Sequence, residues 1–270
     1  MKKFELTKKE IIYDDHKLFQ IKALKNFGDV KAGDLGGFVE KEENLSQDDN
    51  CWIYDNAKVY DNACVFGDAK VYYFAEISDN AKIYGHAEIS GFAKVCDDTR
   101  VCDYAEISEF ATIKGHVLVC DKAKVSGVAK VLDFAAALGN AKISDNAIVS
   151  GFSEVKDNAK VLGNARVLGL TSIYGDVEVS GDTCIEGNHN FIDTKEKLQE
   201  FISKRKLDKN LYEFITNNDE TTMNKETDKE ILGFLDATPE TEIKPDLENE
   251  NLQNNDKITH PSIDEEEMEL

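Results

Sequence analysis

A six-residue unit repeats without insertion or deletion from Ile53 to Phe191, and this strict period constrains the fold more than any other feature. The first position of the unit is almost always Val or Ile, the third is mostly Asp or Gly, and the fifth is small, as in Val59-Tyr60-Asp61-Asn62-Ala63-Cys64. One unit is too short to bury its apolar residue alone, so each unit must stack on another. We therefore predict an all-β solenoid in which a short strand and a turn form each unit.

Side chains of one kind also recur at every third unit, which predicts three strands in each coil. At the fourth position of the unit, two apolar series have this spacing: Phe74, Phe92, Phe110 and Val128, and then Phe134, Phe152 and Leu170. The six-residue period alone would not favour every third unit over every unit or every second one. Three sides per coil predict a triangular prism of between seven and eight coils, in which each side chain lies above its counterpart three units earlier.

The third position of the unit is expected to form the corner of the prism. Glycine accepts a positive φ there without steric cost, and aspartate can hydrogen-bond to local backbone amides. Asn often follows, as in Asp79-Asn80 and Gly163-Asn164, which fits the same corner.

Residues 1–52, before the repeat, combine a strand-like run at Leu18–Leu24 with a glycine-rich stretch at Gly28–Val39. The glycines of this stretch predict tight turns. We expect the segment to cap the first coil, because the end of a solenoid otherwise exposes apolar surface and unpaired backbone groups.

After the repeat region at 53–192, two further segments are predicted. In residues 193–236, apolar residues at helical spacing predict two short helices within 194–217, separated near Lys204-Arg205-Lys206, and a third around Lys229–Leu235. Residues 237–270 hold all three prolines among Asn, Glu, Asp and Thr, a composition typical of a disordered acidic tail.

The chain is strongly acidic, with 53 acidic and 32 basic residues and a formal net charge of −21. Such a chain repels nucleic acid and anionic membranes and attracts basic proteins, so we expect neither nucleic acid nor membrane as a direct partner. It has no apolar run long enough to span a bilayer, and its first ten residues lack the pattern of a signal peptide. We therefore expect a cytoplasmic protein whose six cysteines are thiols.

The repeat over residues 53–191 resembles the hexapeptide-repeat family of left-handed parallel β-helices. The segment Ile21–Ser46, with Phe27-Gly28-Asp29-Val30 and Gly33-Asp34-Leu35-Gly36-Gly37-Phe38, looks like the cap of uncharacterised bacterial and prophage proteins of that family. The resemblance implies a left-handed coil and a homo-oligomer, with a trimer favoured. It also implies one candidate activity, because many members are acyltransferases that hold acyl-coenzyme A between neighbouring prisms and use a histidine as general base.

His86 and His116 are the candidates for that base, since each follows a glycine at a predicted corner. They lie five units apart and are therefore expected on different edges, where they cannot form one site. Asn, Asp, Phe and Lys also occupy this position, so an ordinary exposed residue is the alternative. The repeat has no long loop of the kind that encloses substrate in catalytic members, and no proline occurs before Pro239.

Cys102 and Cys120 are three units apart and are expected to lie one coil apart on one face, close enough for a disulfide or a shared metal. No histidine joins them and Cys96 is expected on another side. Two separate thiols are the favoured interpretation, and no metal site is predicted.

Corner phenylalanines face solvent unless something covers them, and a patch of this kind marks an interface. We predict an interface at Phe74, Phe92, Phe110, Val128, Phe134, Phe152 and Leu170, covered by the chain's own helices, by other copies or by a foreign protein. The favoured function is a non-enzymatic, oligomeric binding protein without a cofactor, either an acidic mimic of nucleic acid that binds a basic protein or a holder of a small ligand between subunits. The alternative is an acyltransferase.

Overall fold

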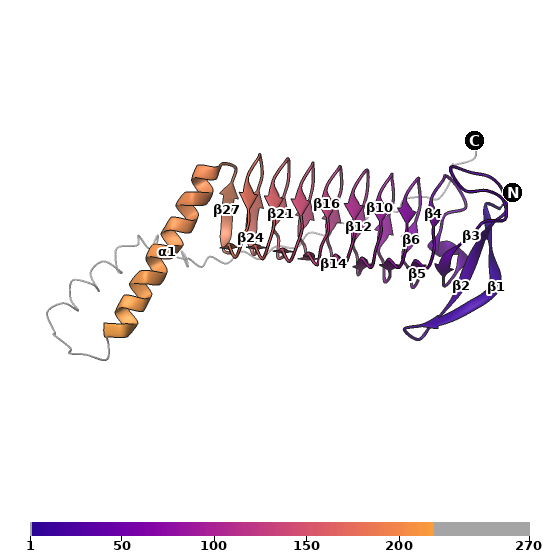
Figure 1. The fold of residues 1–270 in the computed structure, drawn as a ribbon, viewed down its shortest axis with the longest axis horizontal. Coiled ribbons are helices and arrows are strands. Elements are labelled where there is room, and N and C mark those ends of the chain that lie inside the picture. Colours follow the sequence, from indigo (N-terminus) through magenta and orange to yellow (C-terminus); the bar gives the residue numbers. More distant parts are fainter. Residues whose placement is uncertain (1, 219–270) are drawn as a thin grey trace, which may run out of the picture. The chain divides into compact units, whose positions relative to one another are not determined.

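The computed structural model describes residues 2–218, apart from the side chains of residues 189, 208 and 210–218. Met1–Glu213 form one compact unit, and residues 214–218, the described part of a second unit, complete helix α1 (Lys195–Asn218). Within the first unit the chain winds into a parallel β-solenoid with three sheets along its length (Figure 1). The predicted third helix and the predicted disordered tail lie outside the described residues.

The first sheet has 11 strands. In chain order they are β1 (Phe4–Tyr13), β2 (His16–Ala23), β3 (Leu35–Val39), β5 (Lys58–Val59), β8 (Glu76–Ile77), β11 (Lys94–Cys96), β14 (Thr112–Gly115), β17 (Lys130–Asp133), β20 (Ile148–Val149), β23 (Arg166–Val167) and β26 (Cys184–Ile185). A 3-10 helix, η1 (Glu42–Asn44), follows β3.

The second and third sheets have eight strands each. The second contains β4 (Trp52–Ile53), β7 (Lys70–Val71), β10 (Glu88–Ile89), β13 (Glu106–Ile107), β16 (Lys124–Val125), β19 (Lys142–Ile143), β22 (Lys160–Val161) and β25 (Glu178–Val179). The third contains β6 (Cys64–Val65), β9 (Lys82–Ile83), β12 (Arg100–Val101), β15 (Leu118–Val119), β18 (Ala136–Ala137), β21 (Glu154–Val155), β24 (Leu170–Ile173) and β27 (Asn188–Ile192).

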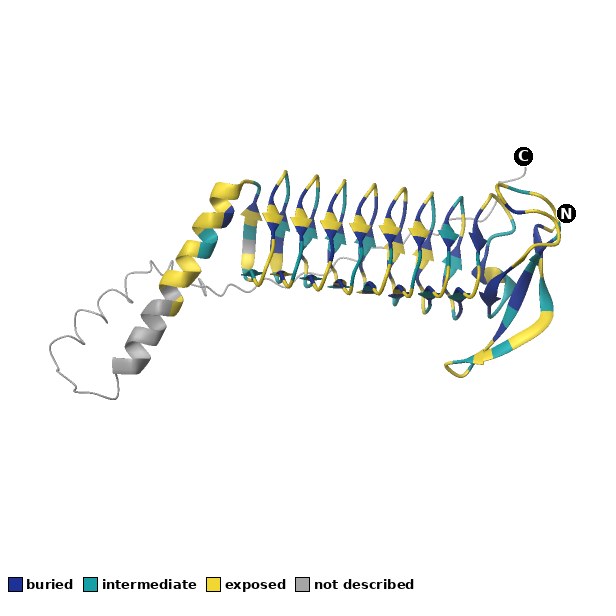
Figure 2. Ribbon diagram, viewed as in Figure 1, coloured by how far each residue is buried: buried dark blue, intermediate teal, exposed yellow. Residues whose placement is uncertain are grey.

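Each coil advances the chain by three units, as the sequence predicts. Val59 pairs with Ile77 in the first sheet, and Val71 pairs with Ile89 in the second. First-position and fifth-position side chains point inward and fill one continuous core, so that buried and exposed residues alternate around every coil (Figure 2). Eight stacked strands in the second and third sheets agree with the seven to eight coils predicted for the repeat. The first sheet has a ninth parallel strand, β3, which precedes the repeat, so the solenoid has about nine turns.

Third-position residues adopt a positive φ at the corners, which confirms the predicted role of Asp and Gly there. The reason for aspartate is different from the predicted one. Its carboxylate accepts a hydrogen bond from the backbone amide of the equivalent residue in the next coil, as Asp121 does from Gly139 (2.8 Å) and Asp145 from Gly163 (2.9 Å). Corner aspartates therefore connect neighbouring coils, in addition to adopting the turn conformation.

The N-terminal segment is an antiparallel hairpin, β1 with β2, extended by β3 into the first sheet. The predicted strand at Leu18–Leu24 is confirmed for Leu18–Ala23, which lie within β2, and Gly28 and Gly33 have the positive φ of turns. The prediction of turns is wrong for Gly36 and Gly37, which lie within β3, where the backbone of the first coil passes close by. A Cβ on Gly36 would lie 2.5 Å from the carbonyl oxygen of Ile53.

The C-terminal region contains one continuous helix, α1, in place of the two predicted short helices. Lys204-Arg205-Lys206 do not interrupt it because Lys and Arg are good helix formers. Leu198, Phe201 and Ile202 of α1 pack against the core cluster of the solenoid. Among residues 2–218 no helix combines the length and the apolar character needed to cross a bilayer.

Candidate functional site

The fourth-position residues form rows along the three edges of the prism, and two of these rows carry the predicted apolar ladders. We call Phe74, Phe92, Phe110 and Val128 the first ladder, and Phe134, Phe152 and Leu170 the second ladder. The first ladder lies where the chain passes from the second sheet to the first, and the second ladder where it passes from the first sheet to the third. The two ladders therefore occupy different edges.

The rings of each ladder stack on one another from coil to coil. Ring centroids are 4.9 Å apart for Phe74 and Phe92, 5.2 Å for Phe92 and Phe110, and 4.8 Å for Phe134 and Phe152, with planes within 7° of parallel. The prediction that these side chains lie above one another is confirmed. Stacking covers the ring faces and leaves the ring edges for contact with other molecules.

Both ladders are open to solvent in the described part of the chain. The exposed fraction runs from 43% at Phe74 to 59% at Phe110 in the first ladder, and from 39% at Leu170 to 59% at Phe152 in the second. Leu198, Phe201 and Ile202 of α1 pack against the core cluster and Leu207 is 70% exposed, so these side chains do not supply a cover for the two edges.

His86 lies on the third edge of the prism. Its Nδ1 is 3.6 Å from a carboxylate oxygen of Asp68 in the preceding coil, and its ring stacks on Tyr104 in the next. A hollow of about 490 Å³ beside it is lined by residues of the N-terminal segment, of the third edge and of the second sheet. These residues are Gly28, Asp29, Asn50, Asp68, Lys70, His86, Glu88 and Tyr104.

The hollow beside His86 is acidic, because Asp29, Asp68 and Glu88 all line it. Lys70 is its one basic residue, and its Nζ is paired with Asp29 at 3.1 Å. Burial favours a higher pKa for Asp29, but hydrogen bonds from Tyr54 and Lys70 outweigh it and hold the pKa below its usual range. The carboxylate of Asp29 is therefore charged at neutral pH.

His116 lies on the same edge as the second ladder, directly before Phe134, on whose ring it stacks at 4.9 Å. Its Nδ1 is 3.4 Å from Asp98. The structure thus gives each candidate histidine one carboxylate and one aromatic neighbour, and it confirms that His86 and His116 do not come together.

His16, which carries no signal in the sequence, has the most enclosed environment of these three histidines. Its Nδ1 lies 3.1 Å from Glu40 and its Nε2 lies 3.6 Å from Asp61, while its ring contacts Tyr60. The hydrogen bond with Glu40 raises the pKa of His16 more than partial burial lowers it. His16 begins β2, Glu40 directly follows β3, and Tyr60 and Asp61 belong to the first coil, so only the folded chain brings these residues together.

Three groups in the described residues have ligand atoms close enough for a metal ion: Cys102, Asp103 and Cys120; His16, Glu40 and Asp61; and Asp79, Cys96 and Asp97. In the second group the two carboxylates lie at opposite nitrogens of the His16 imidazole. This arrangement favours a protonated imidazole between two carboxylates over a metal ion bound by all three side chains. In the third, burial and the charges of Asp97 and Asp79 raise the pKa of Cys96 to about 11, which disfavours the thiolate that binds metals.

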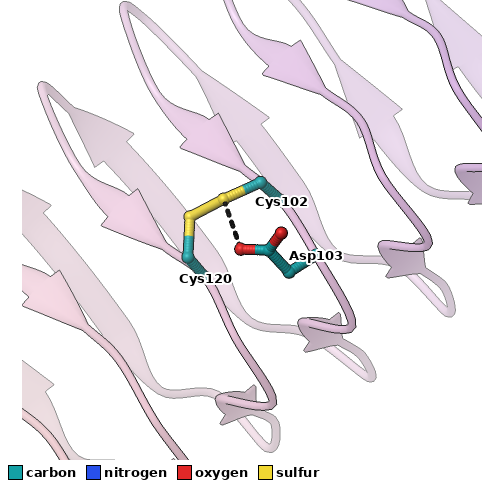
Figure 3. Close-up of side chains that lie close together, drawn as sticks. All are labelled: Cys102, Asp103 and Cys120. Atoms are coloured by element: carbon teal, nitrogen blue, oxygen red, sulfur yellow. Dashed lines mark hydrogen bonds between the residues drawn. A yellow bond between two sulfur atoms is a disulfide. The ribbon is translucent and has the colours of Figure 1, made fainter.

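Cys102 and Cys120 form a disulfide between neighbouring coils (Figure 3). The expectation of two separate thiols is wrong for this pair. Their Cα atoms are 4.7 Å apart, within the range that a disulfide spans, because both side chains occupy the same position of adjacent coils. Bonded sulfurs carry no thiolate, so the group with Asp103 offers no thiolate ligand to a metal.

The fold is a parallel β-solenoid built from six-residue units. No family model matches the chain. A 48-residue stretch is 46% identical to a protein described as the uncharacterized acetyltransferase YdcK of Escherichia coli (strain K12). This stretch is 18% of the chain and 13% of the length of that relative. The partial match and the solenoid together fit a hexapeptide-repeat-like protein.

Proposed function

We propose that this protein is a non-enzymatic binding protein whose contact surfaces are the two aromatic ladders. We further propose that these ladders bind two other copies of the same chain. The single observation that supports the proposal is the stacking of solvent-exposed rings in fixed register along the prism edges. Such an array is held rigidly by the coils beneath it, so little conformational entropy is lost when a partner covers it.

The energetics of the ladders support an interface of this kind. Complete burial of one Phe side chain contributes about 1.5–3 kcal/mol, so covering the still exposed half of each of five ladder phenylalanines contributes about 5 kcal/mol in all. Because the rings repeat at the spacing of the coils, a second prism can match them with its own ladder. The acidic charge of the surrounding surface opposes association at low ionic strength, so we expect added salt to strengthen the contact.

The test is the solution mass of the full chain, measured by light scattering over a range of concentrations and salt. We expect an oligomer that Phe92→Ser combined with Phe110→Ser weakens by at least about tenfold. Asn146→Ser is the matched control, since Asn146 occupies the same edge and position without an aromatic ring. A monomeric wild type, or a double variant with unchanged mass, would refute the proposal.

Acyl transfer is the second candidate, supported by the description of the relative as an acetyltransferase and by the His86–Asp68 pair. Acyl-coenzyme A does not fit the hollow beside His86, because three carboxylates line it and its single lysine is already paired with one of them. Phosphate groups of the donor would be repelled there.

Thiol release from acetyl-coenzyme A, measured with pooled amine and hydroxyl acceptors, separates the two functions. We expect no release above the background of the uncatalysed reaction. Release that is lost in His86→Ala or His116→Ala would establish the enzyme and overturn the preference for a binding protein.

A further inference from the structure

Lys3 is fully buried, with 0% of its surface exposed, and its side chain ends beside Cys51, which is also fully buried. The Nζ atom lies 3.2 Å from Cys51 Sγ, 2.9 Å from the carbonyl oxygen of Asp48 and 3.0 Å from that of Cys51. The ring of Phe27 lies on another side of the amine, 5.1 Å from it. A lysine and a cysteine are thus held in contact away from solvent, although they are distant in sequence.

The surroundings favour the uncharged forms of both groups. Burial lowers the pKa of Lys3, and although Cys51 and Asp49 counteract this, the net direction is downward. Burial likewise raises the pKa of Cys51, with Lys3 counteracting. Carbonyl oxygens of Ser46 and Val65 lie 3.7 Å and 3.6 Å from the sulfur, where they can accept a hydrogen bond from the thiol.

Lys3 Nζ donates hydrogen bonds to the carbonyl oxygens of Asp48 and Cys51 and to the sulfur of Cys51. The two carbonyls need only two hydrogens, so these two bonds persist when the amine gives up one proton. Loss of that proton frees a lone pair on Nζ. The amine nitrogen is then a nucleophile held 3.2 Å from the sulfur of Cys51.

We propose that Lys3 and Cys51 are an oxidative modification site, at which a peroxide converts the contact into a covalent S–N bond. Hydrogen peroxide first transfers one oxygen to the Cys51 sulfur, giving a sulfenic acid and one water. The lone pair of Lys3 Nζ then attacks this sulfur, the S–O bond breaks, and the hydroxide leaves with an amine proton as a second water. The product is a sulfenamide, and the protein has lost two hydrogen atoms to the peroxide.

The neighbourhood of Cys51 selects this product over a disulfide. A sulfenic acid commonly condenses with a second thiol, but among the described residues the atoms that approach Cys51 Sγ within hydrogen-bonding distance are Lys3 Nζ and main-chain carbonyl oxygens. Carbonyl oxygens are poor nucleophiles, whereas the amine is already in contact. Peroxide reaches the pair when the chain at Lys3 and the adjoining β1 open locally.

The link would join Lys3, directly before β1, to Cys51, directly before β4. It closes the N-terminal segment onto the first coil, where Phe4 and Phe27 pack against Trp52. Oxidation is therefore expected to slow the local opening of this segment. A thiol reductant is expected to break the link again, because a thiol attacks the sulfur of an S–N bond as it attacks the sulfur of a disulfide.

The experiment is peptide mapping of the full chain after treatment with hydrogen peroxide, without reductant. We expect a linked pair of peptides that contain Lys3 and Cys51, lighter than their sum by two hydrogen atoms and separated again by dithiothreitol. Lys3→Arg is the matched variant, since guanidinium keeps donors for the two carbonyls but stays protonated and has no nucleophilic lone pair. In that variant we expect no link and a Cys51 that proceeds to sulfinic acid.

Because a substitution of a buried lysine can unfold the segment, the wild-type map decides the proposal by itself. Cys51 left unmodified while the partly exposed Cys96 and Cys184 are oxidised would overturn it. So would a Cys51 sulfinic or sulfonic acid beside an unmodified Lys3. A linked pair that keeps an oxygen would overturn the S–N step.

Discussion

At the N-terminal end of the prism a buried lysine hydrogen-bonds to main-chain carbonyls, whereas at the C-terminal end an exposed arginine does so. Lys3 reaches Asp48 and Cys51 beneath an aromatic cluster, and Arg205 reaches the carbonyls of Cys184 and Glu186, each at 3.1 Å, from the surface of α1. Water can replace Arg205 but has no access to the site of Lys3. The comparison indicates that the N-terminal end depends on a single side chain more than the C-terminal end does.

The role of Arg205 follows from the regular hydrogen bonding of the coils. Arg166 and Leu168 donate their amides to the following coil, where Cys184 and Glu186 are their counterparts. Because the N–H and C=O of one strand residue face the same side, the carbonyls of Cys184 and Glu186 face the open end of the first sheet. The guanidinium supplies the donors that the next coil would have supplied.

The largest effect is expected from Lys3→Ala. This change removes a buried side chain and leaves two carbonyls and a thiol without their partner, which costs about 3 kcal/mol. The free energy of unfolding from urea denaturation, together with hydrogen exchange of the β4 and β5 amides, measures it. Equal losses of unfolding free energy in Lys3→Ala and Arg205→Ala would show that the two ends do not differ in their dependence on one side chain.

A smaller effect is expected from Gly36→Ala, with Gly181→Ala as its counterpart near the C-terminal end. A Cβ added at Gly36 would meet the Ile53 carbonyl at 2.5 Å and Trp52 at 2.7 Å, so a loss of about 2 kcal/mol is expected from overpacking. Gly181 has open space around it, and only its φ of 65° opposes a side chain, which costs about 1 kcal/mol. Urea denaturation of both variants measures which one loses more stability. A larger loss in Gly181→Ala than in Gly36→Ala would contradict the close approach at Gly36.

Arg205→Ala is expected to cost only about 0.5 kcal/mol, because water can hydrogen-bond to the carbonyls that lose the guanidinium. Exchange of the β26 amides should accelerate, while that of the β4 amides should not change. Lys204→Ala is the control, since its partner is Glu200 on the same helix.

The smallest effect is a pH dependence at the N-terminal end. The folded pKa of His16 is raised, so its contribution to stability is present below the unfolded pKa of about 6.5 and is lost as pH rises through the folded pKa. The difference in urea midpoint between the wild type and His16→Gln should therefore shrink from about pH 5.5 to 8. A difference that grows with pH would contradict the Glu40–His16–Asp61 contact.

The sequence predicts the coils well and their ends poorly, for a physical reason. Each unit repeats one local solution 23 times, so the inward positions, the corners and the ladders can be read from spacing alone. The environments of Lys3, Cys51 and His16 are not repeated along the chain. The partners of these residues come from distant segments that carry no periodic signal. The continuity of α1 escapes a prediction that weights apolar spacing above the helix propensity of Lys and Arg.

The bond between Cys102 and Cys120 has a consequence for the chain under tension. A solenoid pulled from its termini is expected to unwind coil by coil, since each coil is held by its neighbours. The chain between the two cysteines would stay closed while the rest extends, withholding about 60 Å of length until a reductant cuts the bond. Pulling a single molecule with and without reductant would show this hidden length directly.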